Sequence, residues 1–162
     1  MTGGTSEGAG MRKFLVCVDD TPECRVALRF ACRRAKKTGG GVTLLRVLEP
    51  PEDKHWIAVE NLMQEEAREE AEVLLQSLAA EVNEWAELMP ELVVREGSKR
   101  DEVLAQIEDD PGIRILVLGA APGPDGPGPL VSSLAGQMSG SLRVPLTIVP
   151  GTLTDQQVDE LT

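Results

Sequence analysis

Five short apolar segments alternate with segments that have the periodicity of amphipathic helices, and this order constrains the fold more than any other feature. The apolar segments span residues 13–18, 42–48, 92–95, 113–118 and 146–149. Dense apolar runs of this length are typical of strands buried on both faces. Their alternation with helices predicts an α/β protein with a five-stranded parallel sheet and helices on both faces.

The segments between these strands carry helix start and stop signals. Thr21 is a suitable N-cap, Pro22 suits the first helical position, and the glycines 39–41 end that helix. Gly97-Ser98 precedes another helix. The expected helices span residues 22–38, 59–86, 99–108 and 130–142.

A chain of 162 residues corresponds to one domain, which we expect over residues 12–151. The Gly-rich segment 1–11 has no hydrophobic pattern and is expected to be a disordered leader. Residues 152–162 are expected to be a polar C-terminal tail with one helical turn at most. No secretory signal and no apolar run of membrane-spanning length is present in this sequence.

The composition excludes several classes of partner. The net charge is −11 and the pI about 4.6, which argues against nucleic acid and against an anionic membrane surface. Aromatic residues make up 2% of the chain, too few for a surface that stacks bases. A nucleotide held by backbone amides is compatible with this acidity, because it needs little side-chain charge.

Three cysteines without a CxxC pair, and a single histidine, do not provide a structural metal site and fit a reducing cytoplasm. Cys17 and Cys32 are predicted to be small buried hydrophobic residues. Cys24 falls in the first turn of a helix, where the helix end can lower a thiol pKa, so a redox role is a minor hypothesis.

Two segments follow the carboxyl ends of strands, where parallel sheets bind ligands. One is Asp19-Asp20-Thr21, and the other is the loop 119–129, which is rich in glycine and proline. Successive glycines let backbone N–H groups approach a phosphate, and a following helix adds its positive end. The loop matches neither a Walker sequence nor GxGxxG. A surface loop without a ligand has the same composition and stays an open alternative.

These residues together resemble the universal stress protein family, in its single-domain UspA form, over residues 12–151. The resemblance rests on five short matches: Val18-Asp19, Leu44 to Val47, Gly97-Ser98, Ile115 to Gly119, and Val144 to Pro150. It implies a Rossmann-like fold of the adenine nucleotide alpha-hydrolase-like type. It also implies a cytoplasmic stress-response protein that forms a homodimer through its last strand, Leu146 to Val149.

ATP-binding members of that family carry G-x2-G-x9-G followed by Ser or Thr. The resemblance implies that Asp19 and Val47 contact the adenosine end of ATP or a related nucleotide. It implies that Gly123, Gly126 and Gly136 surround the phosphates and the ribose. The candidate site also includes the adjoining residues Val18, Asp20, Gly119, Gln137 and Met138. Because the chain is acidic, Mg²⁺ is expected to accompany the nucleotide, with Asp19 as the functional carboxylate and Asp20 as a turn residue.

The sequence departs from the family pattern in three places. Gln137 stands where the family has Ser or Thr, and Asp20 stands where glycine is common. The glycine spacing fits only from Gly123, whereas the family's first glycine directly ends the fourth strand, which is Gly119 here. These departures leave two hypotheses open: a regulatory nucleotide-binding protein, or a family member without nucleotide binding that acts as a protein-interaction module.

We expect no catalysis beyond slow ATP hydrolysis, since no nucleophile–base pair is visible. An enzyme of another α/β family ranks last, because no base or lysine lies between Gly119 and Leu142.

Overall fold

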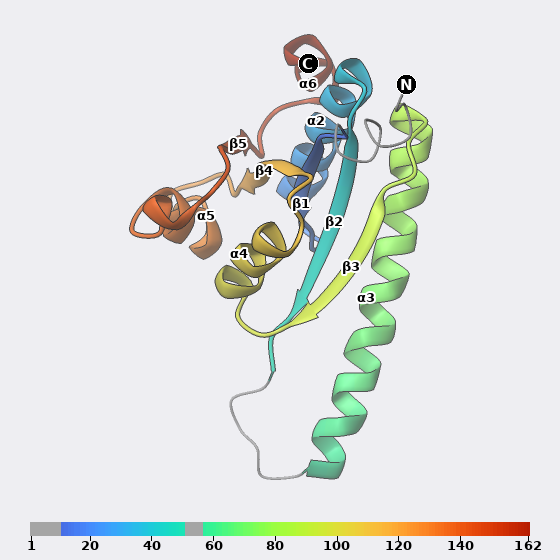
Figure 1. The fold of residues 1–162 in the computed structure, drawn as a ribbon, viewed down its shortest axis with the longest axis vertical. Coiled ribbons are helices and arrows are strands. Elements are labelled where there is room, and N and C mark those ends of the chain that lie inside the picture. Colours follow the sequence, from blue (N-terminus) through green and yellow to red (C-terminus); the bar gives the residue numbers. More distant parts are fainter. Residues whose placement is uncertain (1–10, 51–56) are drawn as a thin grey trace, which may run out of the picture.

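The computed structural model describes residues 11–50 and 57–162, so nearly all of the expected leader lies outside the described residues. It contains a five-stranded sheet with strand order β3-β2-β1-β4-β5, and all four strand pairs are parallel (Figure 1). The strands are β1 (Lys13–Cys17), β2 (Gly41–Leu48), β3 (Glu91–Glu96), β4 (Ile113–Ala120) and β5 (Leu146–Pro150). The helices are α2 (Pro22–Thr38), α3 (Ile57–Ala86), α4 (Lys99–Asp109), α5 (Pro129–Ala135) and α6 (Asp155–Leu161). The predicted α/β fold is confirmed.

Helices cover both faces of the sheet and create two hydrophobic cores. On one face, α2 and α3 pack around Val16, Leu28 and Leu78, all of which are fully buried. On the other face, α4 and α5 pack around Leu15 and Leu116. Successive residues of β1 therefore face opposite cores, which explains why the strand is apolar at consecutive positions.

The predicted caps of α2 are confirmed. Thr21 Oγ1 accepts a hydrogen bond from the backbone N–H of Cys24 at 3.3 Å, and Gly39 ends α2 with φ of 71°. Ser98 caps α4 in the same way, because its hydroxyl accepts from the N–H of Asp101. These short local contacts place both helix N-termini at the carboxyl edge of the sheet.

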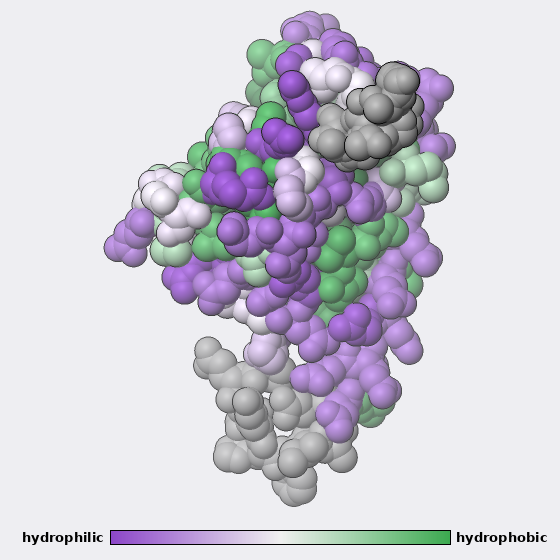
Figure 2. Space-filling view, in the orientation of Figure 1, coloured by the Kyte–Doolittle hydropathy of each residue, from purple (hydrophilic) through white to green (hydrophobic). Residues whose placement is uncertain are grey.

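Helix α3 is much longer than the strands beside it and extends past their carboxyl ends (Figure 1). The ion pair between Arg68 and Glu96, at 2.8 Å, joins the helix to the last residue of β3. Figure 2 shows a mostly hydrophilic surface with a hydrophobic patch over β3. Leu92 of this edge strand is exposed and Val93 is half-buried, so the sheet is less completely covered here than at β1.

The predicted continuous helix over 130–142 is wrong. Helix α5 ends at Ala135, and a separate 3-10 turn, η1, spans Ser139–Ser141. Gly136 causes the break: it leaves the helical conformation, and its N–H donates to the carbonyl of Ser132. The hydroxyl of Ser139 then donates to the carbonyl of Gly136 at 2.9 Å and begins the next turn.

The C-terminal segment is also more ordered than predicted, because residues 155–161 form α6 and pack against α2. Val158 is buried, and Arg29 of α2 holds Asp159 through two hydrogen bonds of 3.0 Å each. Arg29 also lies 5.5 Å from the ring centre of Trp85, a cation–π distance. The capping box of Thr154 and Gln157 starts the helix.

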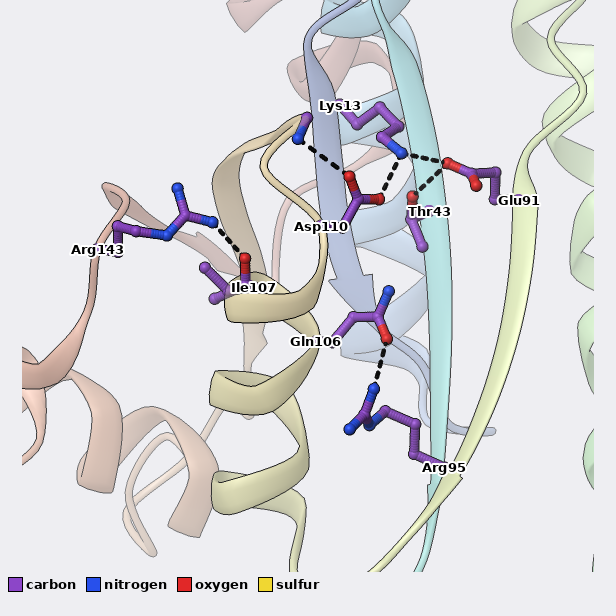
Figure 3. A network of polar contacts seen from close by, with 9 residues as sticks. Lys13, Thr43, Glu91, Arg95, Gln106, Ile107, Asp110 and Arg143 are labelled. Atoms are coloured by element: carbon purple, nitrogen blue, oxygen red, sulfur yellow. Dashed lines mark hydrogen bonds and ion pairs between the residues drawn. The ribbon is translucent and has the colours of Figure 1, made fainter.

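A polar network lies at the amino edge of the sheet, as Figure 3 shows. Lys13 reaches between Asp110 and Glu91, and its Nζ lies 2.7 Å from Glu91 Oε1. Thr43, a fully buried residue of β2, donates to the same carboxylate oxygen. The charge of Lys13 is thereby neutralised by two carboxylates.

Within the described residues, no helix combines the length and the hydropathy needed to cross a bilayer.

Candidate functional site

A pocket of about 230 Å³ lies where the neighbouring strands β1 and β4 end. Connections from β1 and β4 run to opposite sides of the sheet at this point, which is where open parallel sheets bind ligands. Val18, Asp19 and Gly119 line the pocket, so three of the predicted site residues lie together. The first turn of α2 and the first residues of α5 complete its walls.

Asp19 is held in place by the turn that starts α2. Its Oδ1 accepts hydrogen bonds from the N–H of Thr21 at 2.9 Å and from the hydroxyl of Thr21 at 2.5 Å. This arrangement is an Asx turn, which fixes the carboxylate against its own backbone. One carboxylate oxygen is therefore engaged within the protein, and the half-buried side chain presents its remaining acceptor capacity to the pocket.

Two thiols line the same pocket, which the sequence did not indicate. Cys17 ends β1, and the Sγ of Cys24 accepts a hydrogen bond from the N–H of Asp19 at 3.4 Å. Burial raises the pKa of Cys17 to about 11 and that of Cys24 to about 12. The hypothesis that the helix end lowers the pKa of Cys24 is therefore wrong, because desolvation of the thiolate outweighs the helix end. All three cysteines are free.

Gly119 is required by packing at this end of the sheet. A Cβ at this position would lie 2.3 Å from the carbonyl oxygen of Glu23, so the backbone of β4 approaches the first turn of α2 very closely. Gly151 approaches the same turn, because a Cβ added at Gly151 would lie 2.7 Å from the Cβ of Glu23. The contact at Gly119 explains the glycine near the end of β4 independently of any ligand.

The glycine loop has two parts, and only one of them belongs to the pocket. The N–H of Ala121 donates to the carbonyl of Pro127 at 3.1 Å, which closes the loop at its base. Gly123 and Gly126 lie beyond this closure and have open space around them. The residues after the closure, beginning with Pro127 and Gly128, form the pocket wall. The additional residues of the loop thus project away from the pocket.

The other predicted site residues lie outside this pocket. Val47 is buried in the core beneath α4, and Asp20 is exposed beside the turn. Gly136 caps the end of α5, Gln137 is exposed, and Met138 packs against the same core as Val47. The G-x2-G-x9-G spacing from Gly123 therefore does not bring its three glycines together around the pocket.

Lys99 is a pocket residue that the sequence analysis missed. It is the first residue of α4, and it also lines an adjoining cavity of about 290 Å³ together with Ser98, Arg100 and Ser133. Each cavity is below the roughly 300–1,000 Å³ of typical small-molecule sites, and together they reach that range. Cations are unfavourable in the first turn of a helix, because they oppose the helix dipole. Two cations there, Lys99 and Arg100, are therefore a signal for an anion site that was readable in the sequence.

The charges around the pocket are mixed. Asp19 and Glu23 contribute two carboxylates, and Lys99 contributes one ammonium group that lies 4.0 Å from Glu49. An anionic ligand would find its cationic partner on the α4 side. The carboxylates on the α2 side are suited to hydroxyl groups, an amino group or a divalent cation.

A parallel sheet with a pocket at the carboxyl ends of two adjacent strands defines a Rossmann-like α/β protein with a candidate ligand site. The family model described as "Universal stress protein family" matches residues 10–150. The chain therefore belongs to the universal stress protein family. This confirms the resemblance drawn from the sequence.

Several solved structures share the fold. The universal stress protein UspA from Lactobacillus plantarum has a TM-score of 0.71 and 17% identity, and the match covers 85% of this chain and 97% of that one. A universal stress protein in complex with cAMP matches with a TM-score of 0.60 and 11% identity, covering 88% of this chain and 98% of that one. A family protein from Arabidopsis thaliana with AMP bound gives 0.58 and 14%, covering 86% and 90%. A search of curated protein sequences gave no match.

Proposed function

We propose that this protein binds ATP or a related adenine nucleotide in the pocket at the carboxyl ends of β1 and β4. The observation that carries the proposal is the joint placement of Asp19, Lys99 and the Gly128 backbone around one cavity. Structures of the same fold with bound cAMP and AMP support this class of ligand. Asp19 suits the ribose or adenine end, because carboxylates accept hydrogen bonds from hydroxyl and amino groups.

The phosphates would extend from this pocket toward the first turn of α4. Lys99 lies between the two cavities, and Ser98, Arg100 and Ser133 line the second one. These side chains offer two cations and two hydroxyl groups to an anion. Mg²⁺ would accompany the nucleotide, since it takes one or two carboxylates together with phosphate oxygens and would offset Asp19 and Glu23.

We propose a regulatory role for this binding, with at most slow ATP hydrolysis. The thiols that line the pocket have pKa values raised to about 11 and about 12, so they are protonated at neutral pH and poor nucleophiles.

The same proposal includes a cytoplasmic location, a fold unit of residues 12–151 and homodimer formation through β5. β5 is an edge strand, and its Ile148 is 40% exposed, which favours pairing with a second copy.

The proposal is tested by isothermal titration with Mg²⁺ and ATP, together with mass spectrometry of the denatured protein for copurified nucleotide. Leu130 lines both cavities, so Leu130→Trp should fill the space and abolish binding. Leu161→Trp is the matched control, because Leu161 is 61% exposed on α6. Nucleotide binding to wild type and to the control, but not to Leu130→Trp, is the expected result. No heat and no copurified nucleotide in wild type would reject the proposal.

One observation favours a second function, that of a protein-interaction module. The hydrogen bond from Ala121 to Pro127 leaves residues 122–126 projecting outside the pocket, and four of these five residues are exposed. Such a loop suits contact with a protein partner. Deletion of residues 122–126 removes none of the residues that line the pocket, so loss of a copurifying partner without loss of nucleotide binding would support this function.

A further inference from the structure

A second pocket lies at the opposite edge of the sheet, where β1, β4 and β5 begin. It is broad and open, with a volume of about 630 Å³. Arg12, Arg114 and Arg143 line it, and Ile115 and Val144 form part of an apolar wall between them. These three arginines with that wall are called the arginine pocket below. It shares no lining residue with the candidate nucleotide site.

Two of these arginines have no carboxylate partner among residues 11–50 and 57–162, although the chain is strongly acidic. The sequence holds 27 acidic residues against 16 lysines and arginines, so partners are plentiful. Within the described part of the chain, neither Arg12 nor Arg114 forms an ion pair, whereas the adjacent Lys13 has two. Three guanidinium groups around one pocket repel one another, and a bound anion would offset that repulsion by attracting all three.

Arg143 is partly engaged and holds its side of the pocket in place. Figure 3 shows its guanidinium pointing to the backbone carbonyl of Ile107, to which it donates a hydrogen bond. Its Nε lies 3.6 Å from Glu108, and its side chain is still 40% exposed. A guanidinium has five N–H donors, so Arg143 retains donors for a further acceptor.

An irregularity in the sheet places Arg114 at the pocket. Lys13 pairs with Ile113, but the next residue, Phe14, pairs with Ile115. Arg114 is therefore an extra residue in β4, in the manner of a β-bulge, and it is exposed. Bulges redirect a side chain and interrupt strand pairing, and they are found at binding sites. The bulge leaves Arg114 unpaired with β1 and places its charged side chain at the pocket.

We propose that the arginine pocket binds an acidic, extended segment of another polypeptide. Guanidinium groups pair with carboxylates in a bidentate geometry, and the apolar wall suits side chains between successive acidic residues. The arginines come from three separate segments around a broad opening, which suits several separate carboxylates better than one small anion. A nucleic acid is disfavoured, because its long phosphate backbone would face the remaining charge of a chain at −11.

Fluorescence anisotropy tests the proposal with a labelled peptide of alternating glutamate and valine, about twelve residues long. A peptide with glutamine in place of glutamate and a labelled single-stranded DNA of equal charge are run in parallel. The double variant Arg12→Gln/Arg114→Gln removes two pocket charges. The double variant Arg25→Gln/Arg68→Gln removes the same number of charges from two arginines that are 53% and 46% exposed elsewhere.

We expect the pocket variant to bind the glutamate peptide about tenfold more weakly than wild type does. The dissociation constant of the control variant should lie within about twofold of the wild-type value. The glutamine peptide should not bind. Equal weakening in both variants would show that net charge alone attracts the peptide and would overturn the proposal. Tighter binding of the DNA through the same arginines, or no peptide binding at low salt, would also overturn it.

Discussion

The carboxyl and amino edges of the same sheet are lined by different groups. At the carboxyl edge, the pocket is made of backbone turns and helix starts, with Asp19, Glu23 and Lys99 as its charged side chains. At the amino edge, the pocket is lined by three arginines, and two of them, Arg12 and Arg114, form no ion pair within the described residues. The comparison shows that the two ends of the same parallel strands carry chemically different pockets, and that a bulge in β4 contributes to one of them.

The first test asks whether the stability of the fold depends on close backbone contacts at both edges of the sheet. A Cβ at Gly119 would lie 2.3 Å from Glu23 O, and one at Gly40 would lie 2.5 Å from Arg12 O. Gly119→Ala and Gly40→Ala should each lower the free energy of unfolding by about 1–3 kcal/mol, because the backbone must move. Urea denaturation measures this loss. Gly140→Ala is the control, since nothing lies within 4 Å of its Cβ position, and it should change little.

The second test uses pH and concerns the carboxyl edge. Burial raises the pKa values of Cys17 and Cys24 above their ordinary value of 9.0, so the folded state favours the protonated thiols. Their contribution to stability is complete below pH 9 and is lost as the pH rises from 9 through 11 and 12. At pH 10, each thiol should lower the free energy of unfolding by about 1 kcal/mol relative to its value below pH 9.

Urea denaturation at pH 8 and at pH 10 provides that measurement. The double variant Cys17→Ala/Cys24→Ala should lose less stability between these two values than wild type does. Equal losses in the two proteins would contradict the burial of these thiols at the pocket.

The third test concerns the amino edge and has the smallest expected effect. Lys13→Gln should lower the unfolding free energy by about 1 kcal/mol, because it removes the partner of Asp110 and Glu91. Arg12→Gln/Arg114→Gln should change it by no more than about 0.5 kcal/mol, since these exposed side chains form no ion pair with any residue that the structure describes. A large loss in the double variant would mean that the arginines stabilise the fold, and it would weaken their assignment to a ligand.

The fold was predictable because its signals are local. Apolar runs, the N-caps Thr21 and Ser98, and the glycines after α2 each act within a few residues. The same reasoning failed at the chain's end, although the capping box of Thr154 and Gln157 was readable in the sequence. It also failed at Gly136, where the glycine ends a helix that was predicted to continue to Leu142.

The candidate site was predictable only in part. Val18, Asp19 and Gly119 follow directly from the strand ends, and they do line the pocket. Lys99 and Cys24 reach it from helix starts, and their positions depend on how the helices cross the sheet. Gly123 and Gly126 matched a motif by spacing alone, and the hydrogen bond that closes the loop at Ala121 removes them from the pocket.

The most direct test of the account is one calorimetric titration with Mg²⁺ and ATP on wild type, Lys99→Gln and Arg12→Gln/Arg114→Gln. The account predicts binding that is about tenfold weaker in Lys99→Gln, because a charged partner of the phosphates is lost. It predicts a dissociation constant within about twofold of wild type in the arginine variant, because that pocket lies at the other edge. Unchanged binding in Lys99→Gln, or lost binding in the arginine variant, would contradict the assignment of the nucleotide to the carboxyl edge.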